Sequence, residues 1–142
     1  MIFLLALAHA TLVARGLDPE ALAALSTHTA YGDVIAVRTE RTERSIFTVA
    51  TVQSLNAPGT VDVRLQGGCH EGICLTVAGS PTVREGERIF VFLRGDQPTS
   101  FAQGFFVVEG NEARRDVRGL DFREGGPPAA VFPLATLLKL AR

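Results

Sequence analysis

Residues 67–74 read GGCHEGIC, and this short stretch gathers several of the residue types that carry chemistry. Cys69 and Cys74 are separated by four residues, and His70 directly follows the first cysteine. Such a group can form a disulfide, bind a metal ion or act as a pair of reactive thiols. The choice among the three depends on the elements that position the side chains.

The flanking sequence favours a disulfide between Cys69 and Cys74. Strand-like sequence ends near Gln66 and resumes near Ile73, so the cysteines fall where a hairpin narrows, and Gly72 permits the turn. Facing strand ends bring two Cα atoms within the roughly 4.4–6.8 Å that a disulfide requires. Because so short a loop removes little entropy from the unfolded chain, we expect the bond to contribute only about 2 kcal/mol.

Two alternatives remain open for the same residues. Cys69, His70 and Cys74, with Glu71 as a further ligand, could bind zinc, although structural zinc sites normally use two spaced pairs of ligands and only one pair is present. Free thiols could also be redox-active, but the thioredoxin-like motif is C-x-x-C at the start of a helix, whereas this one is C-x4-C between strands. With the disulfide favoured, no cofactor is expected.

Catalytic motifs are missing from the rest of the sequence. There is no G-x-S-x-G, no H-E-x-x-H and no Walker-type glycine loop, and the three histidines (His9, His28 and His70) are far apart in the chain. Neighbouring Cys69 and His70 rarely meet side by side in a strand, so they make a poor nucleophile and base. We therefore expect a protein that is not an enzyme.

Two groups of charged residues are candidate binding surfaces. Arg114, Arg115 and Arg118 form a basic cluster that could contact a polyanion or a protein partner. The RTERTER segment, residues 38–44, alternates in charge and is better explained as a self-neutralising, solvated hairpin tip. Phenylalanines at 101, 105 and 106 could line a ligand groove, although phenylalanines in a strand are more often core.

Helical signals lie only near the two ends of the chain. Asp18 is a good N-cap and Pro19 suits the first helical position, which predicts a short helix over about 18–26. PLATLLKLAR predicts a second helix over about 133–141.

Between the helices, β-branched and alternating apolar residues recur every 8–15 residues. TVDVRLQ alternates with Val61, Val63 and Leu65 inward, and RIFVFLR, residues 88–94, is apolar on both faces. The segment over residues 111–128 is polar and glycine-rich and is expected to be mostly loop. This pattern predicts an all-β fold, namely a small closed or partly open OB-like barrel of five or six mostly antiparallel strands with a short helix at each end.

The N-terminal sequence resembles an export signal. The first fourteen residues carry no charged side chain, residues 2–8 are apolar, and Ala8-His9-Ala10 has the small-x-small form of a signal-peptidase site. We therefore predict a signal peptide over residues 1–10 and a single β-barrel domain over residues 11–142, with an N-terminal buried helix as the alternative. The apolar run is shorter than the roughly 20 residues of a transmembrane helix.

Overall composition narrows the choice of partner. The chain has 142 residues, of which 46% are hydrophobic and 20% charged, and its formal net charge is −1. These values describe one ordinary globular domain. Nucleic acids and anionic membranes call for a basic surface, so neither is an expected partner.

Several of these segments resemble exported bacterial domains similar to the tissue inhibitors of metalloproteinases and the netrin C-terminal modules. The matching segments lie within residues 17–110 and are Gly32-Asp33-Val34, Thr48–Leu55, Val61–Gly68 and Glu85-Gly86-Glu87 leading into Ile89–Leu93. The resemblance implies an OB-like barrel flanked by helices. Inhibitors of that family present an N-terminal cysteine to the protease zinc, whereas cleavage after Ala10 would expose Thr11 here.

These observations predict an exported, non-catalytic binding or structural module. The expected partner is a protein or a cell-surface glycan, and the expected location is the periplasm, the cell surface or the medium. The alternatives are a metal or thiol site at Cys69, His70 and Cys74, and inhibition of a secreted protease through a loop such as Glu109–Arg118, which rests on fold analogy alone.

Overall fold

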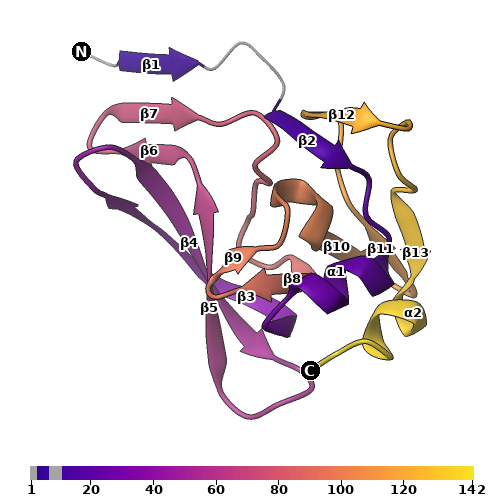
Figure 1. The fold of residues 1–142 in the computed structure, drawn as a ribbon. Coiled ribbons are helices and arrows are strands. Elements are labelled where there is room, and N and C mark those ends of the chain that lie inside the picture. The colour runs from indigo at the N-terminus through magenta and orange to yellow at the C-terminus, as the bar shows by residue number, and fades with distance from the viewer. Residues whose placement is uncertain (1–2, 7–10) are drawn as a thin grey trace.

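The computed structural model describes residues 3–6 and 11–142, which are mostly β-strand (Figure 1). The strands that precede residue 67 are β1 (Phe3–Ala6), β2 (Thr11–Arg15), β3 (His28–Arg41), β4 (Ile46–Ser54) and β5 (Thr60–Gln66). The later strands are β6 (Gly68–His70), β7 (Ile73–Thr76), β8 (Arg88–Arg94), β9 (Gln97–Pro98), β10 (Phe105–Glu109), β11 (Glu112–Arg114), β12 (Leu120–Glu124) and β13 (Val131–Pro133). The helices are α1 (Pro19–Leu25), a 3₁₀-helix (Phe101–Gly104) and α2 (Leu134–Leu138).

The main sheet has eight strands in the order β13-β11-β10-β8-β3-β4-β5, with β9 paired to β8, and neighbouring strands are antiparallel. The all-β, mostly antiparallel prediction is confirmed. The prediction of a small closed or partly open barrel of five or six strands is wrong in closure and strand number, because the sheet is not closed and has eight strands. The edge strand β5 reaches the β8–β9 turn through a hydrogen bond from the Arg64 amide to the Asp96 carbonyl, at 2.7 Å, rather than through a ladder.

Two short strands at one edge account for the extra members of the sheet. β11 and β13 continue the sheet beyond β10. β11 comes from the segment over residues 111–128 that was expected to be mostly loop, and β13 lies just before the expected C-terminal helix. The polar sequence of β11 hid it, since only its Ala113 is buried, and the three residues of β13 are too few to show an alternation.

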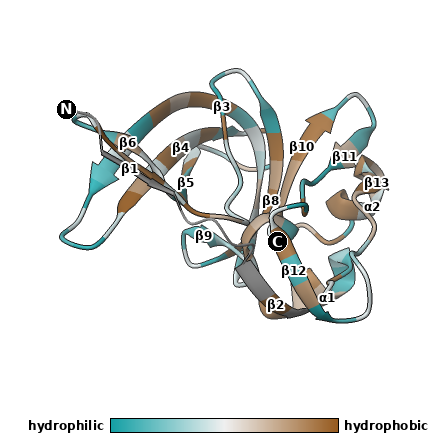
Figure 2. Ribbon diagram, turned by 90° about the horizontal axis from the view of Figure 1, so that it is seen from above, coloured by the Kyte–Doolittle hydropathy of each residue, from teal (hydrophilic) through white to brown (hydrophobic). Residues whose placement is uncertain are grey.

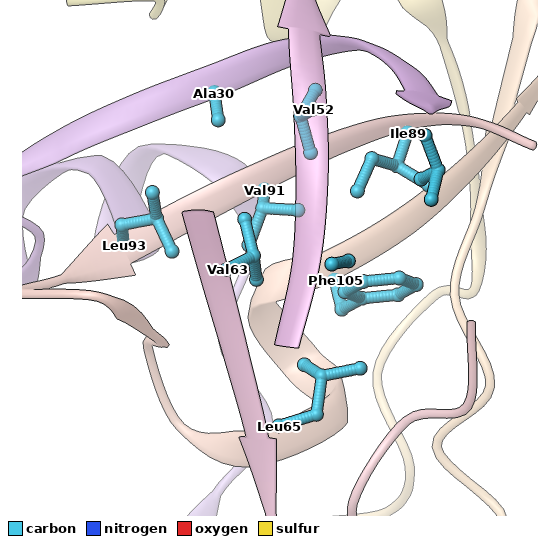
Figure 3. Close-up of a cluster of buried hydrophobic side chains, with 10 residues drawn as sticks. Ala30, Val52, Val63, Leu65, Ile89, Val91, Leu93 and Phe105 are labelled. Carbon is cyan, nitrogen blue, oxygen red and sulfur yellow. The ribbon is translucent and has the colours of Figure 1, made fainter. Parts of the chain in front are cut away.

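Strand β8 separates two hydrophobic cores. Ile89, Val91 and Leu93 point to the concave side of the sheet, while Phe90 and Phe92 point to the opposite side, and all five side chains are fully buried. The concave core, which includes Ala30, Val52, Val63, Leu65 and Phe105, is formed by the sheet curling on itself (Figure 3). Both faces of β8 are therefore apolar, as the sequence indicated.

The opposite side of β8 is aromatic and covered by helices. Ring contacts run from Tyr31 through Phe90, Phe92 and Phe106 to Phe132, with centroids 5.2–6.1 Å apart. Leu22 of α1 and Leu137 of α2 are fully buried in this core. The helix expected over about 18–26 is α1, whose N-cap Asp18 accepts a hydrogen bond from the Ala21 amide at 2.8 Å, and the helix expected over about 133–141 is the shorter α2.

Two small sheets lie apart from the main one. One has the order β1-β7-β6, in which β6 and β7 form an antiparallel hairpin and β1 runs parallel to β7 along the top of Figure 1. The other is a parallel pair of β2 and β12. Phe3–Ala6 are extended, so the alternative of a buried N-terminal helix is wrong for these residues, and the predicted cleavage site at Ala10 lies outside the described residues.

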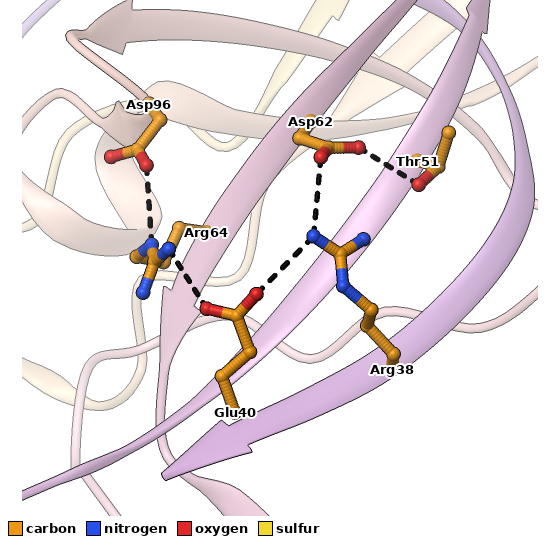
Figure 4. A network of polar contacts seen from close by, with 6 residues as sticks. All are labelled: Arg38, Glu40, Thr51, Asp62, Arg64 and Asp96. Carbon is orange, nitrogen blue, oxygen red and sulfur yellow. Dashed lines mark hydrogen bonds and ion pairs between the residues drawn. The ribbon is translucent and has the colours of Figure 1, made fainter. Parts of the chain in front are cut away.

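The outer face of β3, β4 and β5 carries a network of ion pairs (Figure 4). Arg38 contacts Glu40 at 3.2 Å and Asp62 at 3.3 Å, while Arg64 contacts Glu40 at 2.8 Å and Asp96 at 3.1 Å. The RTERTER segment is thus partly strand, and its first two charged residues pair with each other and with their neighbours.

Within the described residues, no helix has the length and apolarity that crossing a membrane requires.

Candidate functional site

Cys69 and Cys74 face each other across the β6–β7 hairpin and are joined by a disulfide. Their sulfurs are 2.05 Å apart and their Cα atoms 4.0 Å apart. The turn between the strands is Glu71-Gly72, with φ of 51° and 80°, and this pair of left-handed residues is the two-residue turn that suits a tight hairpin. The pairing that the sequence favoured is therefore the one that the structure contains.

His70 does not join the cysteines in a ligand set. Its Nδ1 lies 2.9 Å from the Thr39 hydroxyl, and its Nε2 lies 3.8 Å from a Glu71 carboxylate oxygen. The described part of the chain contains no group of three or more histidine, cysteine or acidic side chains placed to hold a metal ion. While the disulfide is intact neither sulfur is a thiolate, so the metal and free-thiol alternatives require its reduction.

A groove of about 860 Å³ lies on the concave side of the sheet. Phe105, Val107 and Glu109 alternate along β10 and line it, and Glu112 and Arg114 of β11 continue the same surface. In Figure 2 the apolar colour of β10 changes to hydrophilic at the turn into β11. The floor of the groove is therefore apolar at one end and charged at the other.

Two loops form the walls of this groove. One is Gly79–Thr82, and the other runs from Arg115 to Gly119. The first is held in place because the Ser80 hydroxyl donates to the Gln66 carbonyl at 2.7 Å and the Ala102 amide donates to the Gly79 carbonyl at 3.0 Å. The two walls touch at Gly119, where an added Cβ would lie only 2.6 Å from the Gly79 nitrogen.

The charged end of the groove has an unusual pairing. Glu109 and Glu112 stand directly opposite each other across the β10–β11 turn, and both are exposed. Like charges at opposed positions of an antiparallel pair are destabilising. Arg114, opposite Val107 in the same hairpin, is exposed as well and supplies a positive charge to this surface.

The three arginines predicted to form one basic surface are separated by the structure. Arg114 is exposed in the groove, whereas Arg118 is bound by Asp116 through hydrogen bonds of 3.0 and 2.8 Å. Arg115 is only 3% exposed, so the structure does not bring the three guanidinium groups together on one accessible surface.

Arg115 is a core residue of the aromatic side. Its guanidinium lies 5.3 Å from the Phe106 ring centroid and 5.4 Å from that of Phe132, and its N–H groups donate to the carbonyls of Gln103 and Ala129 at 2.7–3.0 Å. Burial lowers the pKa of this side chain to about 10, with the charge of Asp18 acting in the opposite direction. Arg115 therefore stays protonated at neutral pH and supports the groove from behind.

A second cavity of about 320 Å³ lies beside the disulfide. Cys69, Cys74 and Leu75 line it, and Ser80, Pro81 and Thr82 separate it from the groove and line both. The hairpin and the groove are thus neighbours across one anchored loop.

Sequence reasoning found some of the groove residues and missed others. Phe105 was considered both as a groove residue and as core, and it is both. Phe106 belongs to the opposite core. Glu109 and Glu112 lie in the Glu109–Arg118 loop that the inhibitor alternative named, whereas the Gly79–Thr82 wall had no signal in the sequence. The burial of Arg115 had a signal in the sequence, because Ala113, Arg115 and Val117 alternate with polar neighbours and all three are buried.

Comparison of the chain with protein-family models, with curated proteins and with solved structures found no match in any of the three.

Proposed function

We propose that this protein is an exported, non-catalytic binding module that holds part of a partner protein in the groove between Gly79–Thr82 and the β10–β11 hairpin. The observation that carries the proposal is the groove itself, a concavity of about 860 Å³ with an apolar floor and charged groups of both signs at one end. Such a combination is typical of sites that fix a ligand through a few polar contacts around an apolar centre.

The lining favours binding over catalysis. Among the described residues that line the groove there is no histidine, cysteine or lysine. Of the two hydroxyl groups there, that of Ser80 is engaged by the Gln66 carbonyl. In the described lining neither hydroxyl is paired with a histidine or a lysine, the usual activating bases of a serine or threonine nucleophile.

A protein partner suits the groove better than a glycan. Phe105 is the aromatic residue of the described lining, and it is only 3% exposed. The accessible groups are instead Val107, Arg114 and the two opposed glutamates. These groups are complementary to a partner segment that has an apolar side chain next to charged ones. Positive charge from a partner would also relieve the repulsion between Glu109 and Glu112.

Export is supported by the apolar N-terminal run and by the disulfide, since disulfides persist mainly outside the cytoplasm. N-terminal sequencing of the native protein tests this part of the proposal. Thr11 as the first residue is the expected result, and native protein confined to the cytoplasm would contradict it.

Affinity capture from the cell-envelope fraction tests the groove. Wild-type protein and two charge-reversal variants serve as baits. Arg114→Glu changes the groove, and Arg123→Glu changes an exposed position outside the groove lining. We expect the wild type and Arg123→Glu to retain the same partner and Arg114→Glu to lose it.

Equal recovery of the partner by all three baits would show that the groove is not the binding site. A secreted protease among the captured proteins, inhibited by the wild type but not by Arg114→Glu, would favour the inhibitor alternative.

A further inference from the structure

The β6–β7 hairpin carries a third strand on its outer edge. β1 runs parallel to β7, with Phe3 opposite Ile73 and Ala6 opposite Thr76. Parallel strands normally belong to sheets that are covered on both faces. A four-residue parallel strand on the edge of a hairpin instead has the arrangement of an extended segment docked onto an existing edge.

The register of the hairpin shows which backbone groups β7 offers at this edge. The Cα atoms of Cys69 and Cys74 are 4.0 Å apart, close to the roughly 4.5 Å of a non-hydrogen-bonded antiparallel pair and well below the roughly 5.5 Å of a hydrogen-bonded one. The amide and carbonyl of Cys74 therefore point away from β6 and toward β1. Because these groups alternate along a strand, those of Thr76 point the same way.

The hairpin is preorganised to receive a strand. The disulfide joins β6 to β7 at their centre, and the Glu71-Gly72 turn closes the end. The last residue pair between β6 and β7 is Gly68 with Leu75, so Thr76 has no partner residue in β6. The Thr76 amide is therefore available only at the outer edge of β7. A rigid edge loses little conformational freedom when a segment pairs with it.

We propose that this edge of β7 is a strand-acceptor site for an extended apolar segment of a partner protein, which takes the parallel position that Phe3–Ala6 holds here. The proposal rests on the export part of the proposed function, because cleavage after Ala10 removes β1 and leaves the edge open. The segment seated there, FLLA, has no charged or polar side chain, and Ile73 and Leu75 are only half-buried. These features identify the occupant as apolar.

Displacing β1 in the full chain opens the site without a truncation. β1 belongs to the small β1-β7-β6 sheet and not to the main sheet. Successive backbone amides of a strand point in opposite directions, so one of the amides of Leu4 and Leu5 faces β7. The double substitution Leu4→Pro/Leu5→Pro therefore removes one amide that faces β7, whichever of the two residues carries it. The main sheet remains available to fold as before.

The probe is a fluorescein-labelled peptide that carries residues 2–8 followed by three lysines, and binding is followed by fluorescence anisotropy. We expect saturable binding to Leu4→Pro/Leu5→Pro and at least tenfold weaker binding to the wild-type full chain, because β1 competes at a high effective concentration. A control peptide with the same two prolines should not bind. Equal binding of the two peptides would overturn the proposal.

A matched pair of substitutions in β7 locates the site. In the Leu4→Pro/Leu5→Pro background, Thr76→Pro deletes the outward amide, while Thr76→Ala keeps it. We expect Thr76→Pro to weaken peptide binding at least tenfold and Thr76→Ala to leave it unchanged.

Hydrogen exchange provides a second readout that does not depend on whether the Thr76→Pro variant folds. In the Leu4→Pro/Leu5→Pro protein, bound peptide should slow exchange of the Cys74 and Thr76 amides. Unchanged exchange would overturn the proposal.

The groove and the strand-acceptor site fail independently. Arg114→Glu should not change peptide binding, and equal recovery of the captured partner by the wild type and Arg114→Glu would count against the groove alone. N-terminal sequencing that returns Met1 from the exported protein would overturn the strand-acceptor site, because the edge would then stay filled by β1.

Discussion

The two faces of β8 are both apolar, but they are covered in different ways. Phe90 and Phe92 face a layer built from α1, α2 and an unbroken series of aromatic contacts. Ile89, Val91 and Leu93 face the curled sheet itself, and beyond Phe105 that cover ends in the groove. One face is sealed and the other is incomplete.

This difference separates the residues that hold the fold from those that are free to bind. The aromatic face buries even an arginine, so its side chains serve stability. The concave face leaves Val107 half-buried and Glu109 and Arg114 exposed, although it belongs to the same strands. Because ligand sites are typically concave and apolar with a few polar groups, the incomplete face is where we place the ligand.

The largest expected effect is the loss of a central ring from the sealed face. Phe92 is fully buried and contacts both Phe90 and Phe106, so Phe92→Ala should destabilise the protein by about 3–5 kcal/mol. Val107→Ala, in the floor of the groove, should cost less than about 1 kcal/mol. Urea unfolding followed by circular dichroism measures both, and equal losses would show that the two faces do not differ.

Removal of the buried arginine is the next largest effect. Arg115→Ala leaves the carbonyls of Gln103 and Ala129 without their donors, and each such loss costs about 1–3 kcal/mol. We expect a total of about 3 kcal/mol. The neighbouring Arg114→Ala is the control and should stay within about 0.5 kcal/mol of the wild type. If Arg115→Ala cost no more than Arg114→Ala, Arg115 would have to be a surface residue.

Removal of the disulfide should destabilise the protein less than either Phe92→Ala or Arg115→Ala. The double substitution Cys69→Ala/Cys74→Ala releases a constraint on a very short loop, and we expect a loss of about 2 kcal/mol. Wild-type protein under reducing conditions should show the same midpoint in urea as the variant. If the double variant lost as much stability as Phe92→Ala, the disulfide would have to stabilise the whole fold and not only the short hairpin loop.

The smallest effect concerns the outer ion pairs, which belong to neither core. The hydrogen bond from the Thr51 hydroxyl, together with Arg38, lowers the pKa of Asp62. The unfolded chain therefore binds the proton first as the pH falls below about 4, and the stabilisation from Asp62 is lost as the pH passes through its lower folded pKa. Because the side chain is 50% exposed, we expect less than about 1 kcal/mol.

Comparing urea unfolding at pH 7 and at pH 3 measures this contribution. The wild type should lose slightly more stability between the two values than Asp62→Asn. A larger loss in the variant would contradict the assigned sign.

Patterns local in sequence predicted the elements that bury alternate side chains. The two faces of RIFVFLR, the inward Val63 and Leu65, and the cap at Asp18 all follow from spacing and side-chain chemistry. The cysteine pairing could be inferred as well, because a tight turn and two facing strand ends leave few other geometries.

Closure of the sheet could not be predicted in the same way. It depends on whether β5 finds a partner strand, and the short strands β11 and β13 extend the sheet at its other edge instead. The groove was equally hidden, since its walls are brought together by contacts such as Gly79 with Gly119, forty residues apart in sequence. Arg115 was predicted to be a surface residue because its side chain is charged, although its alternation with Ala113 and Val117 indicated burial.

The pairing of β2 with β12 has a consequence for how the chain reaches its final form. Arg15 meets Glu124 across 109 residues, so the earliest described strand after residue 10 has no neighbour until nearly all of the polypeptide has been made. Contacts of such long range form slowly. The segment over residues 11–15 therefore stays without its sheet partner while most of the chain is being made, and the β2–β12 pair forms late.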